Sequence, residues 1–179
     1  ARMIEEAGLK FNTLRPESLD MPFGFKTGAG VIFGNSGGVT EAVLRYAVEK
    51  LTGVTLDSVD FEAVRGEEGL REATLEVGGQ KLRLAVVHGL ANARKVAEQV
   101  KAGQSPYDLI EVMACPGGCI GGAGQPVYRD RQTRRLRTEG LYEADKMLEL
   151  HKPQENHFIS ELYREELGEI GGERAHELL

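Results

Sequence analysis

Two cysteines, Cys115 and Cys119, are the only thiols of the chain, and Pro-Gly-Gly separates them. More glycines follow directly, up to Pro126. Thiolates are the usual protein ligands of iron–sulfur clusters. Glycine has no side chain, so the backbone can wrap closely around a bulky group and present its N–H groups to sulfur. The pattern therefore predicts a segment that binds an inorganic cofactor through soft sulfur ligands.

Other uses of two thiols explain the segment less well. A structural zinc site needs a second pair of Cys or His ligands, and the sequence has no matching pair. A disulfide between the two cysteines would close a very small loop and stabilise little. The cysteine pattern of radical S-adenosylmethionine clusters requires a third cysteine where this chain has Gly122. Two inert buried thiols remain the main alternative.

The ligand count indicates that part of the site lies outside the sequence. A four-iron cluster needs four protein ligands, and the chain has two cysteines. Met113 stands two residues before Cys115 on a predicted strand, so we expect both side chains on the same side. Its thioether would pack against the cofactor there, or simply fill a core position. The histidines are scattered and are interpreted as core or surface residues: His88, His151, His157 and His176.

The elements around the cysteines are predicted from periodicity. Alternation of apolar and polar residues predicts three strands, at residues 59–64, 73–77 and 82–87. Gly78 and Gly79 supply the turn between the last two. A helix capped by Asn92 and ending near Ala102 comes next, and a mostly apolar strand at 107–114 follows it. This order implies a parallel pair with the cysteines at the carboxyl end of its second strand, where open sheets place their sites.

Helices are expected on both sides of this unit. Residues 37–51 are amphipathic, and their glycine-rich entry offers free N–H groups and a positive dipole end. Later helices are predicted at 142–150, at 155–167 with Gly168 as the stop, and in the acidic tail from Gly171. The basic run at 129–137 is interpreted as a solvated loop or an interface arm. The predicted fold class is α/β: a mixed sheet with a parallel strand-helix-strand unit flanked by helices.

Composition excludes several classes of protein. The chain has 179 residues, of which 41% are hydrophobic, enough for one domain with a real core. A formal charge of -6 argues against nucleic-acid or anionic-membrane partners, which demand clustered Lys and Arg. No apolar stretch is long enough to cross a membrane, and no secretory signal is present. These features favour a cytoplasmic protein.

The stretch from Tyr107 to Pro126 resembles the third cysteine motif of the FeFe (iron-only) hydrogenases, whose pattern is E-V-M-A-C-x-G-G-C-x-x-G-G-G-Q-P. The stretch from Thr27 to Ala42 is similar to the glycine-rich turn of that family before a helix, and residues 173–179 to its last helix. The resemblance is strongest to the catalytic subunits of multisubunit, NAD(P)-linked hydrogenases. It implies that residues 1–179 are the C-terminal part of a single iron hydrogenase catalytic domain, an incomplete lobe of the large subunit.

The resemblance also implies roles for individual residues. Cys115 would be a terminal ligand of a four-iron four-sulfur cubane, and Cys119 the thiolate that bridges it to a diiron subsite, the two forming the H-cluster. Met113 is expected beside this catalytic cofactor. Three residues would line the pocket around the diiron unit: Phe33, Gly34 and Val39. Three glycines would donate hydrogen bonds to cluster sulfurs: Gly118, Gly121 and Gly122. The implied reaction interconverts protons plus electrons with molecular hydrogen.

The first two cysteine motifs of the family, T-S-C-C-P and M-P-C-x-x-K, are absent from this sequence. The chain begins as if inside a helix, so we expect a missing N-terminal half that supplies the remaining ligands. Expected partners are electron-transfer subunits, either ferredoxin or NAD(P)-linked. The alternative is a hydrogenase-like iron–sulfur protein of cluster assembly or sensing, without hydrogen turnover, because such proteins keep a similar cysteine segment.

Overall fold

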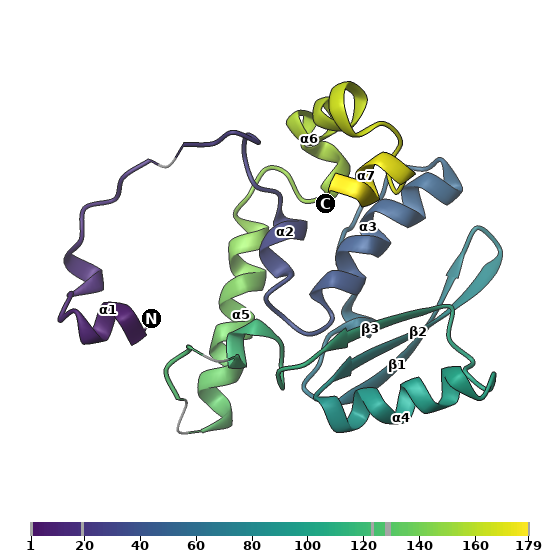
Figure 1. The fold of residues 1–179 in the computed structure, drawn as a ribbon, viewed down its shortest axis with the longest axis horizontal. Helices are drawn as coiled ribbons and strands as arrows, with labels where there is room; N and C mark the ends of the chain where they lie inside the picture. Colours follow the sequence, from purple (N-terminus) through teal and green to yellow (C-terminus); the bar gives the residue numbers. More distant parts are fainter. Residues whose placement is uncertain (1, 19, 123, 128–129, 179) are drawn as a thin grey trace.

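A three-stranded mixed sheet, in the order β1-β2-β3, lies on one side of the protein (Figure 1). The computed structural model describes residues 2–18, 20–122, 124–127 and 130–178. Strands β1, Leu70–Val77, and β2, Gln80–His88, pair antiparallel, and β3, Leu109–Met113, lies parallel to β2. The predicted mixed sheet with its parallel strand-helix-strand unit is therefore confirmed.

Helices cover both faces of the sheet (Figure 1). Helix α3, Gly38–Thr52, packs through Leu44 on the face that carries Leu84 and Val86. Helix α4, Leu90–Lys101, packs through Val96 on the opposite face. The alternation of side chains along β2 produces this arrangement, because successive residues of a strand point to opposite faces. At the far end of the hairpin, Gly78 and Gly79 form the predicted turn, both with positive φ.

A second group of helices lies beside the sheet. The short helix α2, Gly28–Ile32, packs on the long helix α5, Arg131–Lys146 (Figure 1). Buried charges hold α3 to α5. Arg45 of α3 donates to both carboxylate oxygens of Asp145, at 2.9 and 2.6 Å. The shorter elements are α1, Arg2–Glu6; α6, His157–Leu162; a π-helical turn, Tyr163–Leu167; α7, Glu173–Leu178; and 3-10 turns at Phe11–Thr13, Glu62–Val64, Cys119–Gly121 and Pro153–Glu155.

The strand predicted at residues 59–64 is wrong. This segment is irregular and ends in the 3-10 turn Glu62–Val64. Val64 belongs to the core on the α3 side of the sheet, and Phe61 packs against the same core. Two of its carbonyls accept from arginine side chains: Val59 from Arg45 and Val64 from Arg71. Backbone groups occupied in this way do not contribute to a strand ladder.

The basic run at 129–137 is not a loop. From Arg131 on it forms the first half of α5, and Arg129 lies outside the described residues. Asp130 caps this helix by accepting the Thr133 N–H at 2.8 Å, a signal that the sequence interpretation missed. The helix predicted at 142–150 overlaps only the C-terminal end of α5, which ends at Lys146.

Other helix limits differ by a few residues. Helix α4 begins after Gly89, and Asn92 does not cap it. The Asn92 side-chain amide instead donates to the His88 carbonyl at 3.1 Å. The helix predicted at 155–167 is present as α6 and the π-helical turn, and Asn156 caps it. Gly168, with φ of 76°, ends it as predicted.

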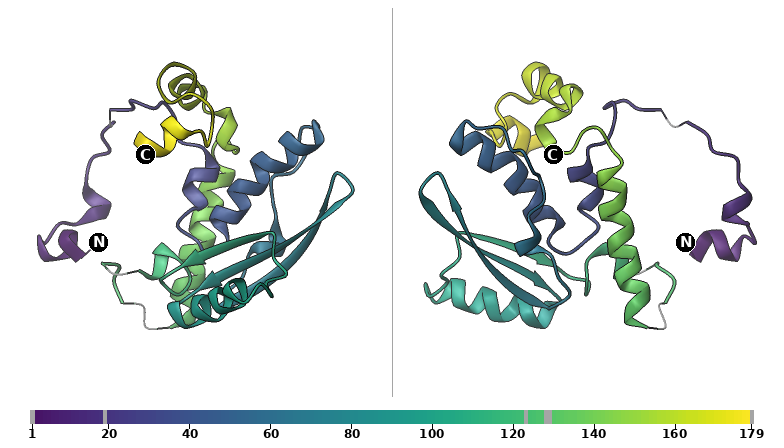
Figure 2. Two further views of the ribbon diagram at one scale, coloured as in Figure 1. Left: turned by 45° about the vertical axis from the view of Figure 1, so that its right-hand side comes forward. Right: turned by 180° about the vertical axis from the view of Figure 1, so that it is seen from behind.

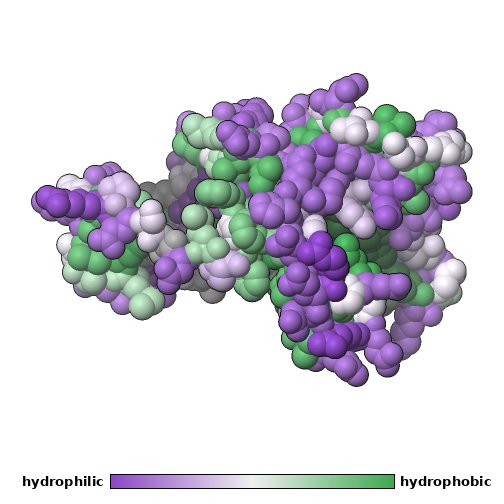
Figure 3. Space-filling view, turned by 90° about the horizontal axis from the view of Figure 1, so that it is seen from above, coloured by the Kyte–Doolittle hydropathy of each residue, from purple (hydrophilic) through white to green (hydrophobic). Residues whose placement is uncertain are grey.

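The segment before α2 runs apart from the sheet and its helices over most of its length (Figures 1 and 2). Near α2 it contacts the body, where Asn156 donates to the carbonyls of Phe23 and Phe25. Figure 3 shows hydrophobic surface on this segment and on the part of the body next to it. The exposed apolar side chains of the segment are Met3, Leu9, Phe11, Leu14, Met21, Phe23 and Phe25. None of the described helices combines the length and apolar character that crossing a bilayer requires.

Candidate functional site

The cysteine loop, residues 114–122, directly follows β3 at the carboxyl end of the parallel pair. Cys115 lies in a bend and is half-buried, whereas Cys119 opens a 3-10 turn and is exposed. Both thiols are free, so no disulfide joins them. The strand ends at Met113, one residue earlier than predicted, so strand alternation does not fix the orientation of Cys115. The location is the one where open sheets place ligands.

A second segment, the glycine turn of residues 33–37, packs against this loop. The Ser36 N–H donates to the Gly117 carbonyl at 3.1 Å, and the Ile120 N–H donates to the Gly34 carbonyl at 3.3 Å. A Cβ on Gly118 would lie 2.6 Å from the Gly34 oxygen, closer than any side chain permits. Two of the predicted site residues, Gly34 and Gly118, thus come together through their backbones.

The glycines of the cysteine loop keep it compact. The N–H groups of Gly118, Gly121 and Gly122 donate to carbonyls of the loop itself, at 3.0 to 3.1 Å. This differs from the sequence-based expectation that these groups point at cluster sulfurs. A Cβ on Gly122 would lie 3.4 Å from the sulfur of Cys115, so the loop folds back over its first thiol.

The three strands each supply one buried polar side chain that holds the glycine turn and the start of α3. Glu111 of β3 accepts the Gly37 N–H at 2.6 Å, and its other oxygen accepts the Thr40 N–H at 2.7 Å. The Thr40 hydroxyl donates to that second oxygen at 2.9 Å. The N–H groups at this helix entry, expected to be free, are therefore occupied by an internal carboxylate at the positive end of the helix dipole.

Arg71 of β1 and His88 of β2 both reach Ser36. The Arg71 guanidinium donates to the Ser36 carbonyl at 3.0 Å and to its hydroxyl at 3.1 Å. Nδ1 of His88 lies 3.2 Å from the same hydroxyl. Burial lowers the pKa of His88, and the positive charges of Arg71 and Arg134 lower it further. Sequence reasoning had treated His88 as an isolated residue, because its partner lies far away in the chain.

Helix α5 holds the other side of the cysteine loop. Arg137 donates to the Ile120 carbonyl at 3.0 Å and to the Pro126 carbonyl at 2.9 Å. Arg134 lies against Gly117, where a Cβ would approach its Cδ to 2.9 Å. The basic run therefore supports the loop with its inward arginines.

The other predicted site residues are more dispersed. Met113 ends β3 beside His88 and is half-buried. Val39 is half-buried in the first turn of α3. The Phe33 side chain is 47% exposed and lines an apolar pocket of about 320 Å³ between α3 and α6. The residues that line this pocket include neither cysteine.

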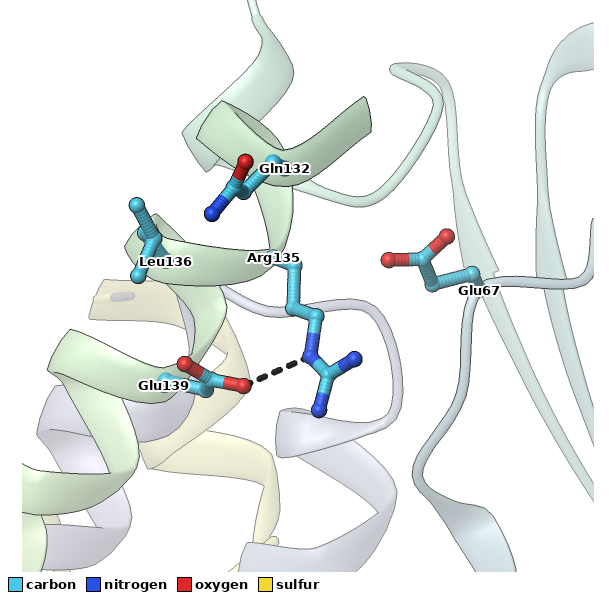
Figure 4. Close-up of a pocket in the computed structure, with 5 residues that line it drawn as sticks. All are labelled: Glu67, Gln132, Arg135, Leu136 and Glu139. Carbon is cyan, nitrogen blue, oxygen red and sulfur yellow. Dashed lines mark hydrogen bonds and ion pairs between the residues drawn. The ribbon is translucent and has the colours of Figure 1, made fainter. Parts of the chain in front are cut away.

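Two polar cavities adjoin α5. One, of about 390 Å³, touches the end of the cysteine loop and is lined by Gly121, Gly122 and Arg137 among others. A wider pocket of about 550 Å³ separates Glu67 from the start of α5 (Figure 4). Figure 4 shows the Arg135–Glu139 ion pair along its wall. The residues that line this wider pocket contain no thiol, so it is not a candidate for the cofactor.

The donor set fits half of an iron–sulfur site. Two free thiols lie in one compact loop that follows β3, which suits soft metal ligation. Among residues 2–18, 20–122, 124–127 and 130–178, no group of three or more His, Cys, Asp and Glu side chains is placed to hold a metal ion.

Comparison with known proteins gives two adjoining matches to family models. Residues 1–123 match the iron only hydrogenase large subunit, C-terminal domain, and residues 131–179 match the iron hydrogenase small subunit. The NADP-reducing hydrogenase subunit HndD of Solidesulfovibrio fructosivorans is 47% identical over 100% of this chain and 31% of its own length. The cytosolic iron-sulfur assembly component 3 of Rattus norvegicus is 35% identical over 99% of this chain and 38% of its own.

Solved structures give the same result. A variant of the FeFe-hydrogenase HydA1 from Chlamydomonas reinhardtii aligns with a TM-score of 0.73 and 36% identity, over 99% of this chain and 52% of that chain. Of the two curated relatives named above, the chain spans about a third of the length.

Proposed function

The chain belongs to the iron-only hydrogenase family, and on this premise we propose that it is the C-terminal part of a hydrogenase catalytic domain. The observation that supports the proposal is the cysteine loop itself. Its two free thiols flank a glycine backbone that packs on a second glycine segment, with three strands fixing the contact. A site built around backbone contacts leaves the sulfur atoms available for a cluster.

In this proposal Cys115 is a terminal ligand of the four-iron four-sulfur cubane, and Cys119 is the thiolate shared with the diiron subsite. The bound H-cluster supplies the redox chemistry of protons and hydrogen. The chain holds the two thiolates within the one short cysteine loop. Gly121 and Gly122 add no side chains after Cys119, and Gly118 lets the loop lie directly on the glycine turn. In this proposal the surroundings of the diiron unit include the apolar side chains of Met113, Phe33 and Val39.

The remaining cubane ligands belong, in this proposal, to the part of the catalytic unit that the chain does not contain. Two thiolates fall short of the four protein ligands of such a cluster. The apolar side chains exposed before α2 are the surface that we expect this missing half to cover. We also propose electron-transfer partners, ferredoxin or NAD(P)-linked subunits, and a cytoplasmic location. Co-purification and cell fractionation of the intact protein test these two points.

Infrared spectroscopy of the intact, matured protein tests the proposal. The resemblance to the FeFe hydrogenases implies a diiron subsite that carries carbon monoxide and cyanide. Both ligands absorb in the infrared where amino acids do not, so a diiron subsite would give separate bands. Met113→Leu nearly preserves volume, and we expect it to shift these bands while the fold survives. Bands that are present but unmoved would remove Met113 from the cofactor environment and leave the rest of the proposal standing.

A second candidate function is cluster assembly without hydrogen turnover. The similarity to a protein named as a cytosolic iron-sulfur assembly component, over 99% of this chain, favours it. The two candidates predict different spectra. A matured sample with an ordinary cubane signal and no carbon monoxide or cyanide bands would support assembly and contradict the hydrogenase proposal.

A further inference from the structure

Glu111 joins β3, which leads into the cysteine loop, to the end of the glycine turn, yet neither the thiol chemistry nor the ligand count assigns it a role. It is 7% exposed and sits on β3, four positions before Cys115. Resting on the proposed function, we propose that Glu111 is a positioning residue. Its carboxylate sets the cysteine loop relative to the glycine turn and thereby shapes the environment of the H-cluster.

Both oxygens of Glu111 are fully engaged. One accepts the Gly37 N–H at 2.6 Å, and the other accepts the N–H and the hydroxyl of Thr40 at 2.7 and 2.9 Å. Hydrogen bonds to an ionised acceptor are shorter and stronger than neutral ones. The carboxylate also lies at the N-terminal end of α3, where the helix dipole is positive. Its position is therefore fixed from several directions.

These bonds close a ring through the candidate site. From Glu111 the chain continues through the end of β3 to Cys115 and Gly117. The Gly117 carbonyl accepts the Ser36 N–H at 3.1 Å, Ser36 leads directly to Gly37, and the Gly37 N–H returns to Glu111 at 2.6 Å. Because a ring fixes every member relative to the others, a change at Glu111 alters where the thiols lie.

Nearby charges strengthen the argument. The buried guanidinium of Arg71 interacts electrostatically with Glu111 and also holds Ser36. Replacing the carboxylate with an amide would place an NH₂ group against one of the N–H donors. At least one hydrogen bond of the carboxylate, to Gly37 or to Thr40, would then be lost, although the volume of the side chain hardly changes. Glu111→Gln is therefore a sharp probe of position.

The chain offers a matched control at the other end of α3. Glu49 also accepts a backbone N–H, from Leu56 at 2.7 Å, and binds Lys152 at 2.7 Å, away from the cysteine loop. The experiment compares Glu111→Gln and Glu49→Gln in the intact, matured protein. It measures the midpoint of thermal unfolding, the reduction potential of the cubane and the infrared bands of the diiron subsite.

We expect both variants to lower the thermal midpoint, while only Glu111→Gln shifts the cubane potential and moves or broadens the infrared bands. Glu111→Asp keeps the charge. Its cubane potential and infrared bands should therefore lie closer to those of the wild type than those of Glu111→Gln do. Wild-type potential and bands in Glu111→Gln, with a lowered midpoint, would reduce Glu111 to a general structural role and overturn the inference.

Thr40→Val provides a second variant if Glu111→Gln does not fold. It removes only the hydrogen bond from the Thr40 hydroxyl. We expect a smaller shift of the cubane potential in the same direction. A folded Thr40→Val sample with the wild-type potential overturns the inference. If the wild type lacks carbon monoxide and cyanide bands, the proposed function fails by itself. The cubane potential of the variants then decides the role of Glu111 separately.

Discussion

Gly118 lies so close to Ser36 that a Cβ on the glycine would be 2.7 Å from the Ser36 nitrogen. Its φ of 95° is also one that glycine adopts readily and other residues rarely do. The backbones of the cysteine loop and of the glycine turn are therefore in direct contact at Gly118. This contact would fix the position of a cofactor that the loop binds.

Gly118→Ala is expected to separate the two segments. A positive φ costs a side-chain-bearing residue about 1–3 kcal/mol, and the clash with the turn adds to this. Gly124→Ala is the matched control, because Gly124 has φ of 89° but open space around its Cβ position. Urea unfolding and iron content of the intact protein measure the difference. Equal losses of stability and iron in the two variants would contradict the proposed role of this contact.

The sheet was predictable because its signals are local. Side chains of β2 alternate between two helices, so Leu84 and Val86 contact one layer while Ala85 and Val87 contact the other. Residues 59–64 show a similar alternation without forming a strand. The difference is tertiary: their carbonyls meet Arg45 and Arg71, partners that a local pattern does not reveal.

The thiols of the candidate site were predictable from the sequence, whereas the residues that hold the cysteine loop in place were not. Cys115 and Cys119 stand together in a motif, whereas Glu111 meets Gly37 across 74 positions of sequence. By composition alone, the basic run at 129–137 indicates side chains that face solvent or a partner. Arg137 instead turns inward, because two loop carbonyls lie within its reach in the fold.

His88 should make stability depend on pH. Its pKa is lowered from the ordinary value of 6.5 by burial first and then by Arg71 and Arg134, while Glu111 acts in the opposite direction. Below pH 6.5 the unfolded chain binds a proton that the folded protein does not. The free energy of unfolding should therefore fall as the pH drops from 6.5 toward the lowered pKa.

Urea unfolding at a series of pH values measures this effect. His88→Gln should flatten the dependence in that window, because the side chain no longer titrates. His176→Gln is the control, since His176 is exposed, and it should keep the wild-type slope. A His88→Gln protein with an unchanged slope would show that another group causes the dependence.

Arg45 should be among the most costly side chains to remove. It is fully buried and binds Glu41 at 2.9 Å and Asp145 at 2.6 Å. Arg45→Met leaves buried carboxylates without their cation, at a cost of about 3–5 kcal/mol. Arg94→Met breaks the exposed pair with Glu98 and should cost about 0.2–1 kcal/mol. Chemical denaturation compares the two, and similar losses would contradict the role of the buried network.

Replacing either cysteine with serine should impair the cofactor, and the two variants should lose different parts of it. Cys119 is the exposed thiol and, in the proposed function, the one shared with the diiron subsite. Serine offers a harder oxygen in place of soft sulfur, so Cys119→Ser in the intact enzyme should lose the diiron subsite and hydrogen turnover. Cys115→Ser should mainly destabilise the cubane, because this half-buried thiol is proposed as a terminal ligand.

Three measurements on each variant separate these outcomes: iron and sulfide content, the electron paramagnetic resonance signal of the reduced cubane, and hydrogen evolution. Cys119→Ser should keep more of the cubane signal than Cys115→Ser while evolving no hydrogen. The two variants serve as controls for each other, since they carry the same atom change in the same loop. Substantial hydrogen evolution by Cys119→Ser would remove its bridging role, because a shared thiolate is the only protein link between the two metal units in this proposal.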